Sequence, residues 1–155
     1  MTMGFASTLS CEMGPPDKKP LGLDLAMTAK STARAFDAAL TEAGGSRSTW
    51  LVLLVVKTGK ALNQREIADA VGIQGATLTH HLNAMESSGL VTRRRDPENR
   101  RVHLVELTDD GEALFHRLRG AAAAFDRKLQ RGLSDEQAAT LTELLSRLRE
   151  NVAEE

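Results

Sequence analysis

Two short helical patterns separated by a glycine turn restrict the fold of this chain more than any other sequence feature. The first begins at Asn63, which can accept from a free backbone N–H while Glu66 reaches back three residues, and it ends at Gly72. The second occupies residues 75–88, where apolar side chains at spacings of four and three predict one buried face. This order is typical of a helix-turn-helix unit. The buried face consists of Leu78, Leu82 and Met85.

A predicted β-hairpin follows this unit directly. Residues 90–93 and 102–107 have the pattern of short strands, and residues 96–99 between them have the composition of a turn. Residues 93–101 carry five arginines against two acids, although the net charge of the whole chain is −1. Any surface for nucleic acid must therefore be local.

Apolar stripes at both ends of the chain predict further helices outside this unit. One begins at Leu21 and ends at the glycine pair 44–45, a long one begins after Thr108, and the last opens with a capping box at 134–137. Exposed apolar stripes need a partner, so we expect a two-fold homodimer. The residues expected at the dimer interface are Leu21, Leu25, Leu129, Leu141, Leu145 and Leu148.

The whole pattern predicts a mainly α-helical protein with a small β-hairpin wing, that is, a winged helix-turn-helix flanked by N- and C-terminal dimerisation helices. A further helix, with Ser48 as its N-cap, is apolar nearly all round and should be central in the core. Four segments are expected: a flexible N-terminal tail, an N-terminal dimerisation helix, the winged DNA-binding region and the C-terminal dimerisation helices. Their ranges are 1–20, 21–45, 46–107 and 108–155.

The exposed face of helix 75–88 has side chains suited to DNA recognition. Short hydrogen-bonding side chains can reach base edges or phosphates in the major groove, and small residues let a helix approach closely. A solvated polar face is the alternative interpretation of the same pattern. The expected DNA contacts are Gln74, Gly75, Ala76, Thr77, Thr79, His80 and Asn83, and the expected supporting residues are Asn63, Gln64 and Arg65.

The arginines of the hairpin strengthen the DNA-binding interpretation. Such a cluster is often only solvated, but this one lies where a wing would lie. A guanidinium at the tip can enter a narrow minor groove, and flanking arginines can neutralise phosphates. The wing residues expected to contact DNA are Arg93, Arg95, Asn99, Arg100 and Arg101.

Residues 62–108 resemble the winged helix of the MarR family in the segments LNQREIADAVGI, ATLTHHLNAMESSGLVTRR and RDPENRRVHLVELT. The wing of the family usually reads as an acidic residue, any residue and Arg, followed by a strand that ends in Leu-Thr-x-x-Gly. Here 99–101 and 107–111 occupy those places. A looser resemblance extends over residues 21–155.

The resemblance implies that helix 75–88 enters the major groove, that Arg101 acts at the wing and that terminal helices of two subunits intertwine. Two residues depart from the usual pattern, since Asn99 stands where the family often has Asp and His80 where it often has Arg. Asn99 cannot form an ion pair with a wing arginine, and His80 is shorter than Arg. The resemblance therefore implies that this chain binds DNA, but it does not imply which DNA sequence the chain prefers.

We therefore expect a sequence-specific regulator of transcription that binds double-stranded DNA in a bacterial cytoplasm. Most members of the family repress, and many respond to small aromatic or phenolic acids, so the resemblance implies a repressor relieved by such an effector. Two alternatives stay open: a winged-helix protein-interaction module without DNA binding, and a redox-responsive regulator that uses Cys11.

Other functional classes find little support in the sequence. The single cysteine excludes an internal disulfide and a multi-cysteine metal site. His80 and His81 are adjacent on a helix and point about 100° apart, so they are poor joint metal ligands. The sequence has no glycine-rich phosphate loop or nucleophile elbow, and no apolar run of the ~18 residues that a membrane span requires. We expect no enzyme, catalytic residues, cofactor, metal or membrane partner.

Overall fold

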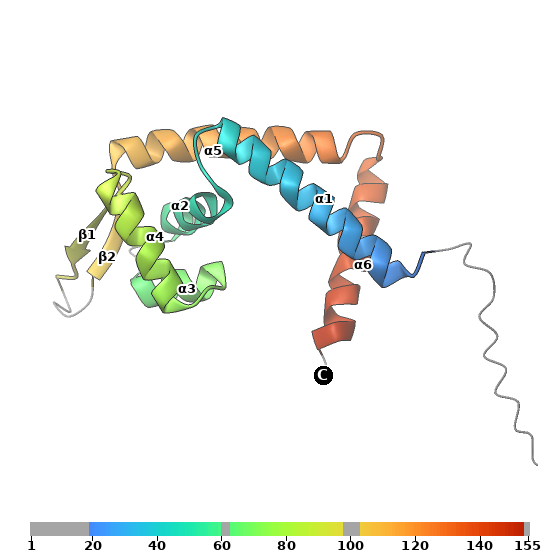
Figure 1. The fold of residues 1–155 in the computed structure, drawn as a ribbon, viewed down its shortest axis with the longest axis horizontal. Helices are drawn as coiled ribbons and strands as arrows, with labels where there is room; N and C mark the ends of the chain where they lie inside the picture. Colours follow the sequence, from blue (N-terminus) through green and yellow to red (C-terminus); the bar gives the residue numbers. More distant parts are fainter. Residues whose placement is uncertain (1–18, 60–62, 98–102, 154–155) are drawn as a thin grey trace, which may run out of the picture.

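The computed structural model describes residues 19–59, 63–97 and 103–153. Within these ranges it contains six helices and one two-stranded antiparallel sheet, which confirms the predicted fold class (Figure 1). None of the helices in these ranges is long and apolar enough to cross a membrane. In chain order the elements are α1 (Leu21–Glu42), α2 (Arg47–Thr58), α3 (Gln64–Val71), α4 (Gly75–Ser87), β1 (Val91–Arg95), β2 (His103–Leu107), α5 (Asp109–Leu129) and α6 (Asp135–Ala153).

Local sequence signals fix most of the helix ends. Asn63 and Glu66 form the expected capping box, and Gly72 ends α3 at φ +74° in the left-handed region. At α2 the structure corrects the sequence prediction, because the N-cap is Ser46 rather than Ser48. The Ser46 hydroxyl accepts from the backbone N–H of Thr49 at 3.1 Å.

The hydrophobic core joins both ends of the chain to the winged unit. Val52 and Leu53 of α2 are fully buried together with Leu40 from the end of α1 and Leu118 from α5. Figure 1 shows α5 running above α2 and the hairpin, with α1 descending beside it. The packing therefore continues across the predicted segment limits at residues 45 and 107.

The hairpin is held against the helix-turn-helix. Its register pairs Val91 with Leu107 and Arg95 with His103. An isolated bridge between Asn63 and Leu104 ties β2 to the start of α3. The wing consequently has a fixed base beside the two helices that it flanks.

The opposite end of the molecule exposes a large apolar surface. Helix α6 turns away from α5 and has no buried residue (Figure 1). Leu21 is 68% exposed and Leu141 is 48% exposed. Together α1, α5 and α6 enclose an apolar groove of about 860 Å³. The groove is lined by Leu25, Phe36, Phe125, Leu129, Leu141 and Leu145, among others.

Candidate nucleic-acid interface

Helix α4 has the two faces that a recognition helix requires. Leu78, Leu82 and Met85 are buried, as the spacing predicts. The N-cap residue of α4, Gln74, forms no side-chain cap, so the side chains of the described residues leave its first backbone N–H groups available to a phosphate. Of the predicted contact residues, Gln74, Gly75, Ala76, Thr77, His80 and Asn83 are exposed, and Thr79 is half-buried.

Thr79 links the two helices of the motif. Gln64 Nε2 donates to the Thr79 hydroxyl, which in turn donates to the backbone carbonyl of Gly75 at 2.8 Å. The single hydroxyl proton of Thr79 is thereby used inside α4. In this arrangement Thr79 positions α4 against α3 rather than donating to a base, and Gln64 supplies the expected support. The third expected supporting residue, Arg65, is exposed.

Arg93 was expected to contact DNA from the wing, but it faces α4. Its Nε donates to the Glu86 carboxylate at 3.0 Å, and its Nη2 donates both to Glu86 and, at 2.6 Å, to Asn83 Oδ1. Only 21% of the Arg93 side chain is exposed. The two expected contacts Arg93 and Asn83 therefore form one cluster through Glu86, a residue that sequence reasoning missed because it is exposed and carries no motif.

The Arg93 hydrogen bond holds the pKa of Glu86 below its ordinary value, and the positive charge of Arg93 adds to this effect, while partial desolvation opposes it. A lowered carboxyl pKa means that the pair stabilises the fold above the ordinary glutamate range. That contribution is lost as the pH falls through the lowered pKa. The cluster is therefore intact at neutral pH.

The next two arginines of β1 differ in their surroundings. Arg94 Nε donates to Glu106 on β2 at 2.7 Å, so its charge is neutralised across the hairpin. Arg95 is exposed at the end of β1 and makes no ion pair within the described residues. It is the described wing arginine best placed to meet a phosphate. The other predicted wing residues, Asn99, Arg100 and Arg101, lie outside the described residues, as does Cys11.

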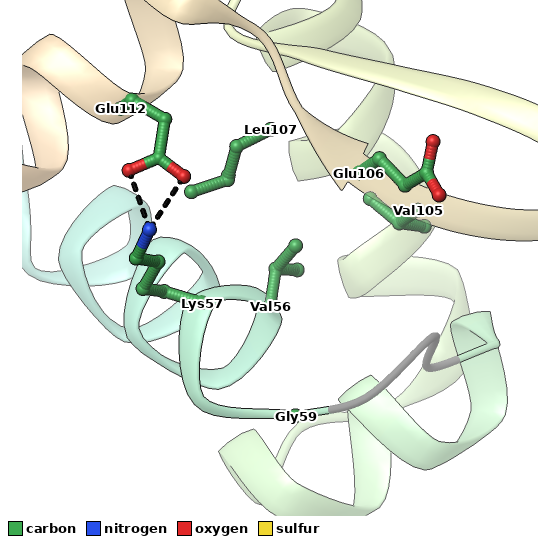
Figure 2. A pocket seen from close by; sticks show the side chains of 7 residues that line it. All are labelled: Val56, Lys57, Gly59, Val105, Glu106, Leu107 and Glu112. Carbon is green, nitrogen blue, oxygen red and sulfur yellow. Dashed lines mark hydrogen bonds and ion pairs between the residues drawn. The ribbon is translucent and has the colours of Figure 1, made fainter.

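A small pocket lies behind the hairpin, between the end of α2 and the start of α5 (Figure 2). Lys57 Nζ contacts both carboxylate oxygens of Glu112, at 2.7 and 2.8 Å. His116 Nε2 lies 3.8 Å from the same carboxylate. Because Lys57 and Glu112 neutralise each other, the pocket offers little net charge to a ligand, and the pair serves mainly to join α2 to α5. Among the described residues no group of three or more His, Cys, Asp or Glu could hold a metal ion.

Comparison with known proteins places the chain among winged-helix regulators. The profile of the MarR family matches residues 46–103, from the N-cap of α2 to the first residue of β2. The curated HTH-type transcriptional regulator YdgJ of Bacillus subtilis (strain 168), described as uncharacterised, is 32% identical over 109 residues. That match covers 70% of this chain, which spans 66% of the relative's length.

Two solved structures are similar over most of their length. The transcriptional repressor CouR, bound to a 23-mer DNA duplex, superposes with a TM-score of 0.76 at 27% identity, covering 84% of this chain and 92% of that chain. The transcriptional regulator PA3341 superposes with a TM-score of 0.72 at 31% identity, covering 88% of this chain and 100% of that chain. In both cases the shared fold extends well beyond the winged unit to the helices that bound the apolar groove.

Proposed function

Because the chain belongs to the MarR family, we propose that it is a sequence-specific DNA-binding regulator of transcription that acts as a homodimer and represses. The observation that carries this proposal is the exposed face of α4, with free backbone N–H groups at its start, beside a wing whose base is fixed and whose Arg95 is unpaired within the described residues. The DNA-bound state of the similar repressor CouR supports the same assignment.

In the proposed complex α4 lies in the major groove and the wing contacts the flanking backbone or minor groove. The homodimer would form through the apolar surface of α1, α5 and α6, which a single chain leaves exposed. Two-fold symmetry then presents two copies of α4 one DNA turn apart. We expect the protein to act in the cytoplasm, where the chromosomal DNA lies.

We further propose that a small aromatic or phenolic molecule relieves repression, as the family resemblance implies. Such an effector works only if it binds the DNA-free arrangement of the dimer more tightly than the DNA-bound one. Its direct signature would be a loss of DNA affinity at constant salt, matched by tighter effector binding to the DNA-free protein.

The test of DNA binding is a titration of labelled duplexes at several salt concentrations, using DNA from upstream of the protein's own gene and a random duplex of the same length. We expect tighter binding to the upstream DNA and a linear fall of log affinity with log salt on both. Failure to bind either duplex at low salt contradicts the proposal and favours the protein-interaction module.

His80→Ala is expected to weaken operator binding by ~1–3 kcal/mol and to relax the preference at one base pair per half-site, because His80 is exposed on α4. The measurement compares sequences selected by parent and variant from a randomised pool. His116→Ala removes an exposed imidazole from α5 and is the control. If the His80 variant selects the same sequence as the parent, His80 is only a surface residue.

Arg95→Ala is expected to weaken binding to specific and random duplexes alike, because a guanidinium on the wing neutralises phosphate rather than reading a base. The slope of log affinity against log salt should fall by ~1 for each subunit's lost contact. Arg94→Ala is the matched control, since Glu106 already neutralises that neighbouring charge. Equal slopes for parent and Arg95 variant would mean that Arg95 does not touch DNA.

A further inference from the structure

We propose, on the basis of the proposed function, that Arg93 is a positioning residue for base readout: it holds the amide oxygen of Asn83 toward β1, so that Asn83 meets DNA as a hydrogen-bond donor only. In this proposal Asn83 on α4 contacts the base, and Arg93 on the neighbouring strand β1 sets the orientation of the Asn83 amide.

The chemistry of the two side chains fixes the orientation of the amide. A guanidinium has donors and no acceptor, so the Asn83 atom that contacts Arg93 Nη2 at 2.6 Å must be the carbonyl oxygen. The amide nitrogen then cannot face Arg93. Asn83 is exposed, and within the described residues its Nδ2 donates no hydrogen bond. The free group that Asn83 offers is therefore an N–H donor.

Arg93 is itself anchored, which makes it able to hold Asn83. Its Nε and Nη2 both donate to Glu86, one turn further along α4 from Asn83, and its side chain is largely covered. A planar guanidinium held at two of its nitrogens loses little further freedom when it binds a third group. Glu86, Arg93 and Asn83 thus behave as one unit that connects β1 to the outer face of α4.

The fixed orientation changes which bases Asn83 can recognise. A freely rotating asparagine can pair with adenine through two hydrogen bonds, accepting from N6 and donating to N7. With its oxygen held toward Arg93 on β1, Asn83 cannot make both adenine hydrogen bonds and turns its N–H donors outward. A donor suits guanine, whose N7 and O6 are both acceptors, better than adenine, which offers N7 alone beside an amino group, and the amino group of cytosine opposes it.

The test measures the affinity of the full-length dimer for its selected operator and for duplexes carrying each base substitution in turn. In the parent, one base pair per half-site should prefer an acceptor edge, and Asn83→Ala should abolish that preference. Arg93→Met frees the amide and should shift the preference at this pair toward adenine, changing the ratio of affinities about tenfold. Arg93→Lys, which keeps a charged donor, should restore part of the parent preference.

Three controls separate positioning from other roles. Arg94→Met removes the neighbouring charge on β1, which pairs with Glu106 instead, and should leave the preference unchanged. The double variant Asn83→Ala with Arg93→Met should match Asn83→Ala alone at this pair, because Arg93 acts through Asn83. Asn83→Asp keeps an oxygen toward Arg93 and replaces the outward donor by an acceptor, so it should favour an amino edge even if Arg93→Met does not fold.

Three results for the Arg93→Met variant would overturn the inference while leaving the proposed function intact. The first is an unchanged base preference, and the second is equal loss of affinity for every substituted duplex. The third is a slope of log affinity against log salt lowered by about 1 per subunit, which marks a direct phosphate contact. A parent protein that selects no operator at all overturns the proposed function and the inference with it.

Discussion

Gly111→Ala is expected to lower the free energy of unfolding by about 3 kcal/mol or more, the upper end of what forced overpacking costs. A Cβ at this position would lie 2.0 Å from the backbone oxygen of Leu90. That oxygen cannot easily move, because it accepts from the backbone N–H of Thr108 at 3.1 Å, while Gly111 N donates to the Thr108 hydroxyl at 3.0 Å. The hairpin and α5 meet at this point, so the clash pushes the wing away from its base.

The matched control is Gly120→Ala in the same helix. A Cβ there meets nothing within 4 Å, so alanine should stabilise the protein by about 0.5–1 kcal/mol through its helix propensity. Chemical denaturation of the three proteins at one protein concentration measures both effects. A Gly111 variant as stable as the parent would contradict the close approach of Gly111 to Leu90.

The double variant Leu141→Asp, Leu145→Asp is expected to be monomeric and to bind its operator at least about 100-fold more weakly. Both leucines line the groove between α1, α5 and α6, and a carboxylate buried without a partner opposes association. Loss of the dimer separates the two recognition helices. The ~10²–10⁴-fold gain in DNA affinity that comes from two linked binding sites is then lost. Sedimentation at micromolar concentration should give twice the 16.8 kDa chain mass for the parent and the single mass for the variant.

Ala139→Asp adds the same charge to α6 and is the control, since Ala139 is exposed and does not line the groove. It should remain a dimer with parental affinity. A parent that sediments as a single chain, or a double variant that stays dimeric with full affinity, would contradict the proposed interface.

The helix ends of the winged unit could be predicted from the sequence, because residues close together in the chain determine them. Asn63 and Glu66 lie within one helical turn, and Gly72 tolerates the positive φ that ends α3. The choice between Ser46 and Ser48 as the cap of α2 was not accessible, since both hydroxyls can cap. The turn after α1 decides it, because this turn leaves Ser46 in an extended conformation with α2 starting directly after it.

Pairings between elements lay beyond the sequence. The run Arg93–Arg95 predicts a basic strand, but only the packing of β1 beside α4 turns Arg93 toward Glu86, and only the strand register brings Arg94 near Glu106. The role of Gly111 could not be predicted either. A glycine inside a helix indicates only lower helix stability until its distance to Leu90 is known.

Sequence-specific DNA binding by a two-fold dimer can be measured by selecting bound sequences from a pool of randomised duplexes. We expect one enriched inverted repeat, with half-site centres about 10–10.5 base pairs or a multiple of that spacing apart. Bound DNA with the same composition as the starting pool, at a salt concentration where the protein still binds duplexes, would contradict it.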